Sequence, residues 1–414
     1  MTTRSVSLAA FRVRSFRFQW PADLLTSWAF EMETLILGWY LMVETGSVLL
    51  LTTFGALQFV GTLAAPMFGV LGDRLGSRTI LCIMRGCYVG LAALLALLAL
   101  AGQLTPAWVI AIAGLGGLLR PNDQLLRHSL IGETILPDDL MGALALSRAS
   151  MDSARVAGAL AGAGLSALLG IGVAYAAVTL VYAASLALTF GVARARPLPD
   201  AGTRLSHQGP VATLPPSRYR DLMDGLVHVA TTPTLLAVAL LAFLINLTAY
   251  PLSNGLLPYV AQRIYLVDAT GLGWLVASFS IGALVGSIVM TVTGGPRRPA
   301  RAMLVYTAAW YSVLLGFAHV HSLGAGIVLL SIAGFVQSVA MISLMAALLA
   351  AADERFRARV IGVRMLAVYG LPVGLVGSGV LIEYIGFPLT ATLSCALGLA
   401  VTIAIGLRWR ASMW

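Results

Sequence analysis

The sequence predicts an all-α polytopic membrane protein with twelve transmembrane helices, and two observations lead to this prediction. The first is composition: of the 414 residues, 59% are hydrophobic and only 10% are charged, whereas soluble domains carry about 25% charged residues. The second is that apolar runs of about 20 residues recur along the chain, which is the length a helix needs to cross a bilayer. A mean hydropathy of +0.91 agrees, so a water-soluble globule is excluded.

The predicted spans follow one another with turn residues between them. Thr-Gly-Ser at 45–47, a Gly- and Pro-containing segment at 102–106 and Gly-Gly-Pro at 294–296 mark three of the breaks. Hydropathy places the spans at 19–43, 49–71, 79–101, 106–126, 141–168, 171–193, 233–262, 269–293, 301–319, 323–350, 359–383 and 386–407.

One connection is long and divides the chain into two sets of six spans. We expect an N-terminal six-helix bundle at 1–193, a cytoplasmic linker at 194–232 and a C-terminal six-helix bundle at 233–414. The linker segment 218–228 has the pattern of an amphipathic helix at the membrane surface. The halves are weakly similar, since the Gly-x-Gly at 162–164 recurs 215 residues later. Two pseudo-symmetric halves are typical of secondary transporters, whose substrate site lies between the halves near mid-membrane.

The basic residues predict the orientation. All 26 are arginines, and they gather at the N-terminus and in the loops on one side, while the opposite loops contain only Arg263. By the positive-inside rule, both termini and the linker are cytoplasmic, and we expect the inner (cell) membrane of a bacterium. The net charge of +9 follows from this topology and from contact with anionic membrane lipids, without a nucleic-acid partner.

Catalytic chemistry has no support in the sequence. Without lysine, the chain has neither a P-loop nor a Schiff-base nucleophile, so it does not drive itself with its own ATPase. The three cysteines have no metal-ligand spacing, and the five histidines form no H-E-x-x-H. We therefore expect no cofactor, no metal and no enzyme, and a channel is disfavoured because the charges do not repeat as rings.

The loop after the second span carries a recognisable pattern, because residues 69–78 read GVLGDRLGSR. This resembles the signature loop of the major facilitator superfamily, although Ser77 departs from the basic residue usual there. The resemblance implies the fold of that superfamily. It also implies a cytoplasmic gating role for Gly69, Asp73, Arg74, Gly76 and Arg78.

Two further segments resemble one branch of that superfamily. Residues 39–47 (WYLMVETGS) are similar to drug exporters of the macrolide, tetracycline and siderophore efflux type. Residues 157–164 (AGALAGAG) partly resemble the glycine motif of drug–proton antiporters, without its proline; small residues also pack helices in any membrane protein. The resemblance implies export by proton antiport.

Acidic residues within the spans are the candidates for proton coupling, because an ionisable group in the membrane needs a functional or structural reason. Glu31 lies on a polar stripe of the first span and is the first candidate, while Glu33 and Asp123 are the alternatives. The competing interpretation of Glu31 is a structural salt bridge to an arginine of a neighbouring span. Carboxyl groups in apolar surroundings can titrate near neutral pH, as coupling requires.

Three further charged residues lie within the predicted spans, and each has more than one possible partner. Arg120 matches the buried arginine that drug antiporters often carry on the fourth span, or it pairs locally with Asp123, and Asp123 is also spaced to pair with Arg127. Asp152 and Arg155 are three residues apart: they pair with each other, or Arg155 exchanges partners with the glutamates of span one during transport.

The substrate cavity is predicted from polar and aromatic residues on cavity-lining spans, each of which could equally join helices. Hydrogen-bonding and aromatic walls suit an amphipathic organic molecule better than a bare ion. We therefore expect a monomeric exporter of small drug-like or siderophore-like molecules that uses proton antiport and alternating access; a lipid flippase and a narrow-specificity metabolite carrier are the alternatives. The candidate cavity residues are Trp28, Asn246, Tyr250, Asn254, Trp274 and Gln337.

Overall fold

The computed structural model describes residues 9–64, 67, 68, 71, 75–135, 137–193, 227–352, 360, 364 and 366–410. Over these residues the chain is helical, with no strand, as the sequence predicts. The first half contains η1 (Ala9–Arg12), α1 (Arg14–Thr45), α2 (Val48–Leu57), η2 (Val60–Ala64), α4 (Ser77–Leu100), α5 (Pro106–Thr134) and α6 (Pro137–Phe190). The second contains α8 (Pro233–Tyr250), η3 (Pro251–Gly255), α9 (Leu257–Tyr259), η4 (Val260–Ile264), α10 (Ala269–Thr293), α11 (Pro299–Phe317), α12 (Leu323–Ala351), η5 (Ala367–Tyr369), α14 (Gly370–Ile385) and α15 (Phe387–Arg408).

The 54-residue element α6 consists of two spans joined by a tight reversal at Gly170. Gly170 has φ 76° and ψ 168°, a conformation that is open only to glycine, and it falls in the predicted break between 168 and 171. Helix α6 counts as two segments. When η2 is joined to α2, then η3, α9 and η4 to α8, and η5 to α14, the described residues form twelve helical segments, one for each predicted span. Eight described segments are long and apolar enough to cross a membrane on length and composition alone.

Two helices extend beyond their predicted spans. Helix α1 begins at residue 14 instead of 19, and α5 continues to residue 134 instead of 126. Helix α5 continues past the end of the apolar run, because polar side chains beyond that point, such as Arg127, find hydrogen-bond partners on α1. Of the predicted linker, residues 194–226 lie outside the described residues, and with them nearly all of the predicted surface helix at 218–228.

The second span is broken, which the sequence does not predict. Helix α2 ends at Leu57, and the chain passes through Gln58 into the 3₁₀-helical segment η2. At this break the backbone touches α5: a Cβ on Gly61 would lie 2.2 Å from the carbonyl oxygen of Leu118, and one on Gly117 would lie 2.0 Å from that of Leu57. This backbone contact leaves no room for a side chain at either position, so both must be glycine. It holds the break in the second span against α5.

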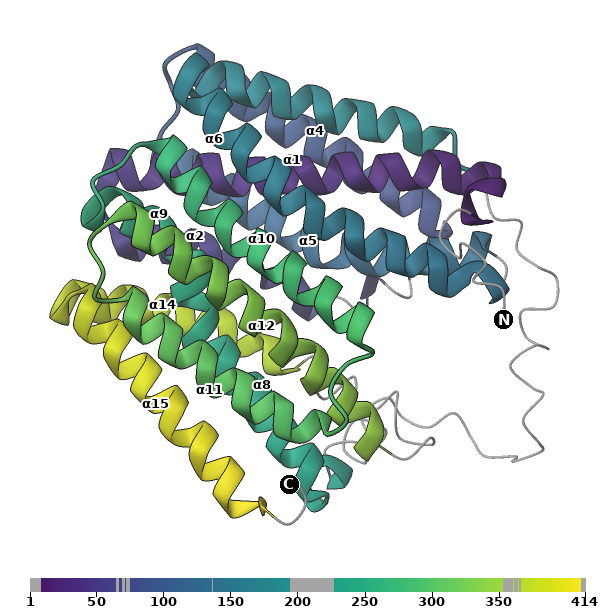
Figure 1. The fold of residues 1–414 in the computed structure, drawn as a ribbon. Helices are drawn as coiled ribbons and strands as arrows, with labels where there is room; N and C mark the ends of the chain where they lie inside the picture. Colours follow the sequence, from purple (N-terminus) through teal and green to yellow (C-terminus); the bar gives the residue numbers. More distant parts are fainter. Residues whose placement is uncertain are drawn as a thin grey trace.

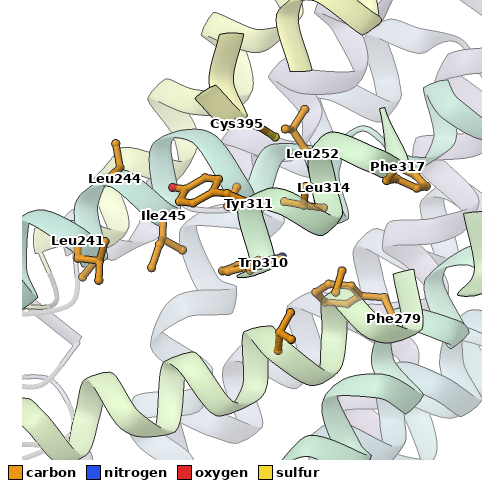
Figure 2. Packing of buried hydrophobic residues seen from close by; sticks show 14 of the residues in the cluster. Leu241, Leu244, Ile245, Leu252, Phe279, Trp310, Tyr311, Leu314, Phe317 and Cys395 are labelled. Carbon is orange, nitrogen blue, oxygen red and sulfur yellow. The ribbon is translucent and has the colours of Figure 1, made fainter. Parts of the chain in front are cut away.

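One apolar core lies within the first half, and a second lies mainly within the second half and also includes Leu35, Val48, Ala159 and Ala163 of the first. In the second half, Trp310 and Tyr311 of α11 are fully buried and pack among side chains of α8, α10 and α15 (Figure 2). The first half packs α4, α5 and α6 around α1, whose Ile36 and Leu37 are each 1% exposed. Helix α1 therefore brings Asp23 and Glu33 into the interior of the first half.

The halves meet at the end of the molecule that carries the turns at 46–47, 101–105, 265–268, 318–322 and 386, which we call the distal end. Helix α10 lies beside α6, and α14 beside α2 (Figure 1). A Cβ on Gly273 of α10 would lie 2.5 Å from the Cβ of Ala163, and one on Gly379 of α14 would lie 2.1 Å from the Oγ1 of Thr52. Small residues thus close the distal end.

Candidate functional site

Charged side chains inside the first half form buried networks around α1. Asp23 accepts a hydrogen bond from the Nη2 of Arg85 on α4, and the Nη1 of Arg85 donates to the Oγ1 of Thr189 on α6. Arg85 is only 1% exposed. Arg127 of α5 reaches the same carboxylate, with 3.7 Å between its Nε and the Asp23 Oδ1. One carboxylate therefore joins three helices.

Arg127 connects this network to Asp123, one turn earlier on α5. The two side chains form an ion pair, and the Nη1 of Arg127 donates to the Oγ of Ser27 at 2.8 Å and to the carbonyl oxygen of Asp23 at 3.0 Å. Asp123 is 1% exposed. Of the two local pairs considered for Asp123, the structure forms the one with Arg127, while Arg120 has a different partner.

Arg120 pairs with Glu33 across the α1–α5 interface. Glu33 Oε2 also accepts from the hydroxyl of Tyr182 on α6, at 2.7 Å. The other nitrogen of Arg120, Nη1, donates to Gln58 Oε1 at 3.0 Å and to Thr34 Oγ1 at 3.2 Å. Glu33 is 7% exposed, so this pair is enclosed and has hydrogen-bonding partners on four segments of the chain.

Phe30 lies between the two networks. Its ring is 4.7 Å from the guanidinium carbon of Arg120 and 5.9 Å from that of Arg127, and it stacks edge-on against Tyr88 at 5.0 Å. A cation over an aromatic face is stabilised by the ring quadrupole. Phe30 therefore supports both arginines while keeping their carboxylate partners apart.

Glu31 points elsewhere, toward α6. Its Oε1 lies 3.5 Å from the Nε of Arg155, and the two side chains are 33% and 47% exposed. Gly158 allows this approach, because a Cβ there would lie 2.8 Å from the Cβ of Glu31. Tyr250 of α8 lies near enough to influence Arg155, so the Glu31–Arg155 pair lies on the side of the first half that is turned toward α8.

Asp152 does not form a salt bridge with Arg155, contrary to the local pairing considered from the sequence. It pairs with Arg148 at 3.5 Å, and the Arg148 side chain is 65% exposed. Arg155 is instead the partner of Glu31. The structure thus contains the salt bridge that was one alternative for Glu31; any exchange of partners during transport stays a prediction.

Two predicted cavity residues of the second half, Tyr250 and Gln337, contact each other. Gln337 Nε2 donates to the Tyr250 hydroxyl at 2.9 Å, and the Tyr250 ring packs edge-on against Trp310 at 5.3 Å. Asn246 is engaged locally, since its Nδ2 donates to the carbonyl oxygen of Ala242 at 2.8 Å.

Three other predicted cavity residues are not brought to Tyr250. The π-helical turn that follows Tyr250 shifts the register, and Asn254 is exposed and donates to Ser253. Trp274 is 52% exposed on the α10 face that also exposes Ile281 and Val285. Trp28 is half-buried on α1, and its Nε1 is buried without a hydrogen-bond partner.

The signature loop is only partly described. Gly69, Asp73 and Arg74 lie outside the described residues. Gly76 has φ 82° and precedes α4, and Arg78 donates to the carbonyl oxygen of Phe190 at 2.8 Å. The Ser77 that departs from the pattern donates its hydroxyl to Glu133 Oε1 at 2.5 Å, which fastens α4 to α5.

Several partners in these networks were not identified from the sequence. Arg85 was the most visible signal, because it is a lone charge in an apolar run. Gln58 and Tyr182 gave no signal, since single polar residues are common in spans. Among the described residues, no group of three His, Cys, Asp or Glu could hold a metal ion.

The comparisons with known proteins agree with this architecture. Residues 5–414 match the family model described as transmembrane secretion effector, and no curated protein matches by sequence. A mutant of the nucleoside transporter NupG has a TM-score of 0.71 at 14% identity, covering 97% of this chain and 100% of that chain.

Two other solved structures are similar. A bacterial homolog of the human lysosomal transporter Spinster, inward-facing and occupied, gives a TM-score of 0.70 at 13% identity, covering 96% of this chain and 97% of that one. A POT family transporter in complex with 5-aminolevulinic acid gives 0.69 at 13% identity, covering 97% of each chain. These identities show the shared fold alone. Because the family model spans almost the whole sequence, the chain belongs to the transmembrane secretion effector family of major facilitator superfamily transporters.

Proposed function

We propose that this transporter exports small amphipathic organic molecules from a bacterial cell in exchange for protons, by alternating access. The observation that carries the proposal is the Glu31–Arg155 pair. It lies within membrane-spanning helices, yet its side chains are 33% and 47% exposed, on the side near Tyr250. Charged residues inside a membrane bundle mark substrate or proton paths.

The chemistry of this pair suits antiport. An ionised Glu31 attracts a cationic group of the substrate, and a proton bound to the same carboxyl group removes that attraction. One group then holds either ligand but not both. Glu33 and Asp123 remain the alternative proton sites; both are buried, and each has an arginine partner.

The opposite wall supports an organic substrate. Tyr250 accepts a hydrogen bond from Gln337, so its own hydroxyl hydrogen is available to a ligand, and its half-buried ring adds aromatic surface. Aromatic surface with a few placed polar groups is typical of sites for small organic molecules.

The arrangement of the halves supports pickup from the cytoplasm. The arginine distribution assigns the distal end to the outside and both termini to the cytoplasm. The close approaches between the halves at Gly273 and Gly379 lie at the distal end. With this orientation, the proposal is that the structure is a state closed to the outside and that a single chain forms the transport path.

Flux measurements in liposomes test the proposal. Protein reconstituted into vesicles with an imposed pH gradient should transport ethidium, a fluorescent amphipathic cation, against its gradient. Glu31→Gln should abolish the dependence on the gradient, because the amide cannot exchange a proton. Glu44→Gln, which removes an exposed acid from the same helix, is the matched control and should behave as the parent. Transport by the parent that ignores the pH gradient would refute antiport.

A further inference from the structure

Gln58 occupies the break in the second span, and it is a partner of Arg120 to which the proposed function gives no role. Its side-chain oxygen accepts two hydrogen bonds, from Arg120 Nη1 at 3.0 Å and from Thr34 Oγ1 at 3.2 Å. Because Arg120 binds Glu33 with its other terminal nitrogen, one guanidinium joins the acid of α1 to the break that ends α2.

The chain beyond the break is anchored to α5. Asn122 Nδ2 donates to the carbonyl oxygen of Gly61 at 2.9 Å, and the backbones touch at Gly61 and Gly117. Asn122 is fully buried. These contacts hold η2 against α5. Gln58 therefore lies between this anchored segment and helix α2.

The chain before the break belongs to the closure of the distal end. Thr52 of α2 lies against Gly379 of α14, and a Cβ on Gly55 would lie 3.3 Å from a methyl group of Leu375. Helix α2 is therefore held against α5 at its break, packs against Gly38 of α1 through Leu51 and Phe54, and contacts α14 of the second half. A rotation at the break would separate α2 from α14.

We propose that Gln58 is a positioning residue that links the Glu33–Arg120 pair to the break in the second span. The charge of the pair thereby sets whether α2 stays closed against α14. When Glu33 is ionised, Arg120 is held between Glu33 and Gln58, and a hydrogen bond from a cation to Gln58 is stronger than one between neutral groups. When Glu33 is neutral, Arg120 loses its only carboxylate among the described residues and releases Gln58. The proposal rests on alternating access from the proposed function, but not on the proton as the coupling ion.

A double-mutant cycle on the distal-end distance tests the link. Spin labels replace Gln103 and Ser322, two exposed distal-turn residues on opposite halves, in a background whose three cysteines are alanine. Glu33→Gln mimics the neutral acid without a change of pH. It should raise the ratio of open to closed molecules about tenfold, the effect of losing roughly one charge-assisted hydrogen bond. With Gln58→Leu present, Glu33→Gln should change the ratio by less than about twofold, the limit for sites that no longer interact.

The controls separate coupling from general damage. Thr53→Val changes a neighbouring residue of α2 and should leave the tenfold effect intact. Gln58→Asn withdraws the amide by one methylene and should reproduce Gln58→Leu, which keeps the test decisive if the leucine variant folds poorly. A tenfold effect that persists in the Gln58 variants overturns the proposal, as does a Glu33→Gln variant with the parent distribution. Gradient-independent ethidium flux would refute proton antiport and leave this cycle unaffected.

Discussion

At the scale of single residues, the first half contains more charge than a membrane interior tolerates without pairing. Asp23 is 7% exposed and Arg85 1%, so each would be costly alone. Removing one partner of a buried pair leaves an uncompensated charge, whereas replacing both can be nearly neutral. The ion pairs therefore hold α1 in register with α4 and α5 mainly because any other register would leave a buried charge without a partner, and less because of their net attraction.

This asymmetry gives a prediction for Arg85. Arg85→Met should destabilise the protein by about 3 kcal/mol, because Asp23 keeps only the more distant Arg127. The double variant Asp23→Asn/Arg85→Met should recover at least half of the loss. Thermal unfolding of the detergent-solubilised protein measures both. A double variant that is no more stable than the single one would show that the net attraction, and not the buried unpaired charge, dominates.

The sequence located the charged residues but could not assign their partners. Glu31 and Glu33 lie on different sides of α1, as residues two apart on a helix must. Their partners on α5 and α6 depend on how the helices are rotated, and that is set by close approaches such as Gly158 against α1. The local spacing favoured a pair between Asp152 and Arg155, but in the folded protein Arg155 pairs with Glu31 of another helix.

At the scale of the helices, α2 and α5 show why the spans were predicted well and their interruptions were not. Hydropathy records whether a segment is apolar, and the broken second span is apolar throughout. The break depends on two glycines facing each other from different helices, Gly61 and Gly117, a relation that no local pattern contains. The reversal at Gly170 could be predicted from the sequence, because this glycine falls between two apolar runs.

The contact between α2 and α5 predicts unequal effects of substitutions along one helix. Gly117→Val places a side chain 2.0 Å from the carbonyl oxygen of Leu57, and backbone cannot move aside cheaply. Gly114→Val, three residues earlier, meets nothing within 4 Å and is the matched control. Overpacking costs about 1–3 kcal/mol or more, so the first variant should lose most of its monodisperse peak in size-exclusion chromatography. Equal yields of the two variants would contradict the close packing.

At the scale of the whole molecule, small residues hold the halves together at the distal end, and among the described residues no salt bridge joins the two halves. The six salt bridges among the described residues all lie within the first half. Small-residue contacts let backbones approach closely without directional bonds. Such an interface separates without leaving unpaired charges in the membrane, as a carrier that alternates between two states requires.

The closure itself can be disturbed at one residue. Gly379→Leu should wedge α14 away from α2, because its Cβ would lie 2.1 Å from Thr52 Oγ1, and that hydroxyl is already bonded to the carbonyl oxygens of Val48 and Leu49. Gly377→Leu, on the same helix, has open space around its Cβ and serves as the control.

Spin labels at Gln103 and Ser322 report the outcome of the wedge. The Gly379 variant should shift the distance distribution toward the open distal end, while the Gly377 variant keeps that of the parent. The reason is steric: only the closed state brings Thr52 against this glycine, so the added side chain raises the free energy of that state and leaves the open state unaffected. If both variants kept the parent distribution, the α2–α14 contact would not be what closes the distal end, and the role proposed for Gln58 would lose its mechanical basis.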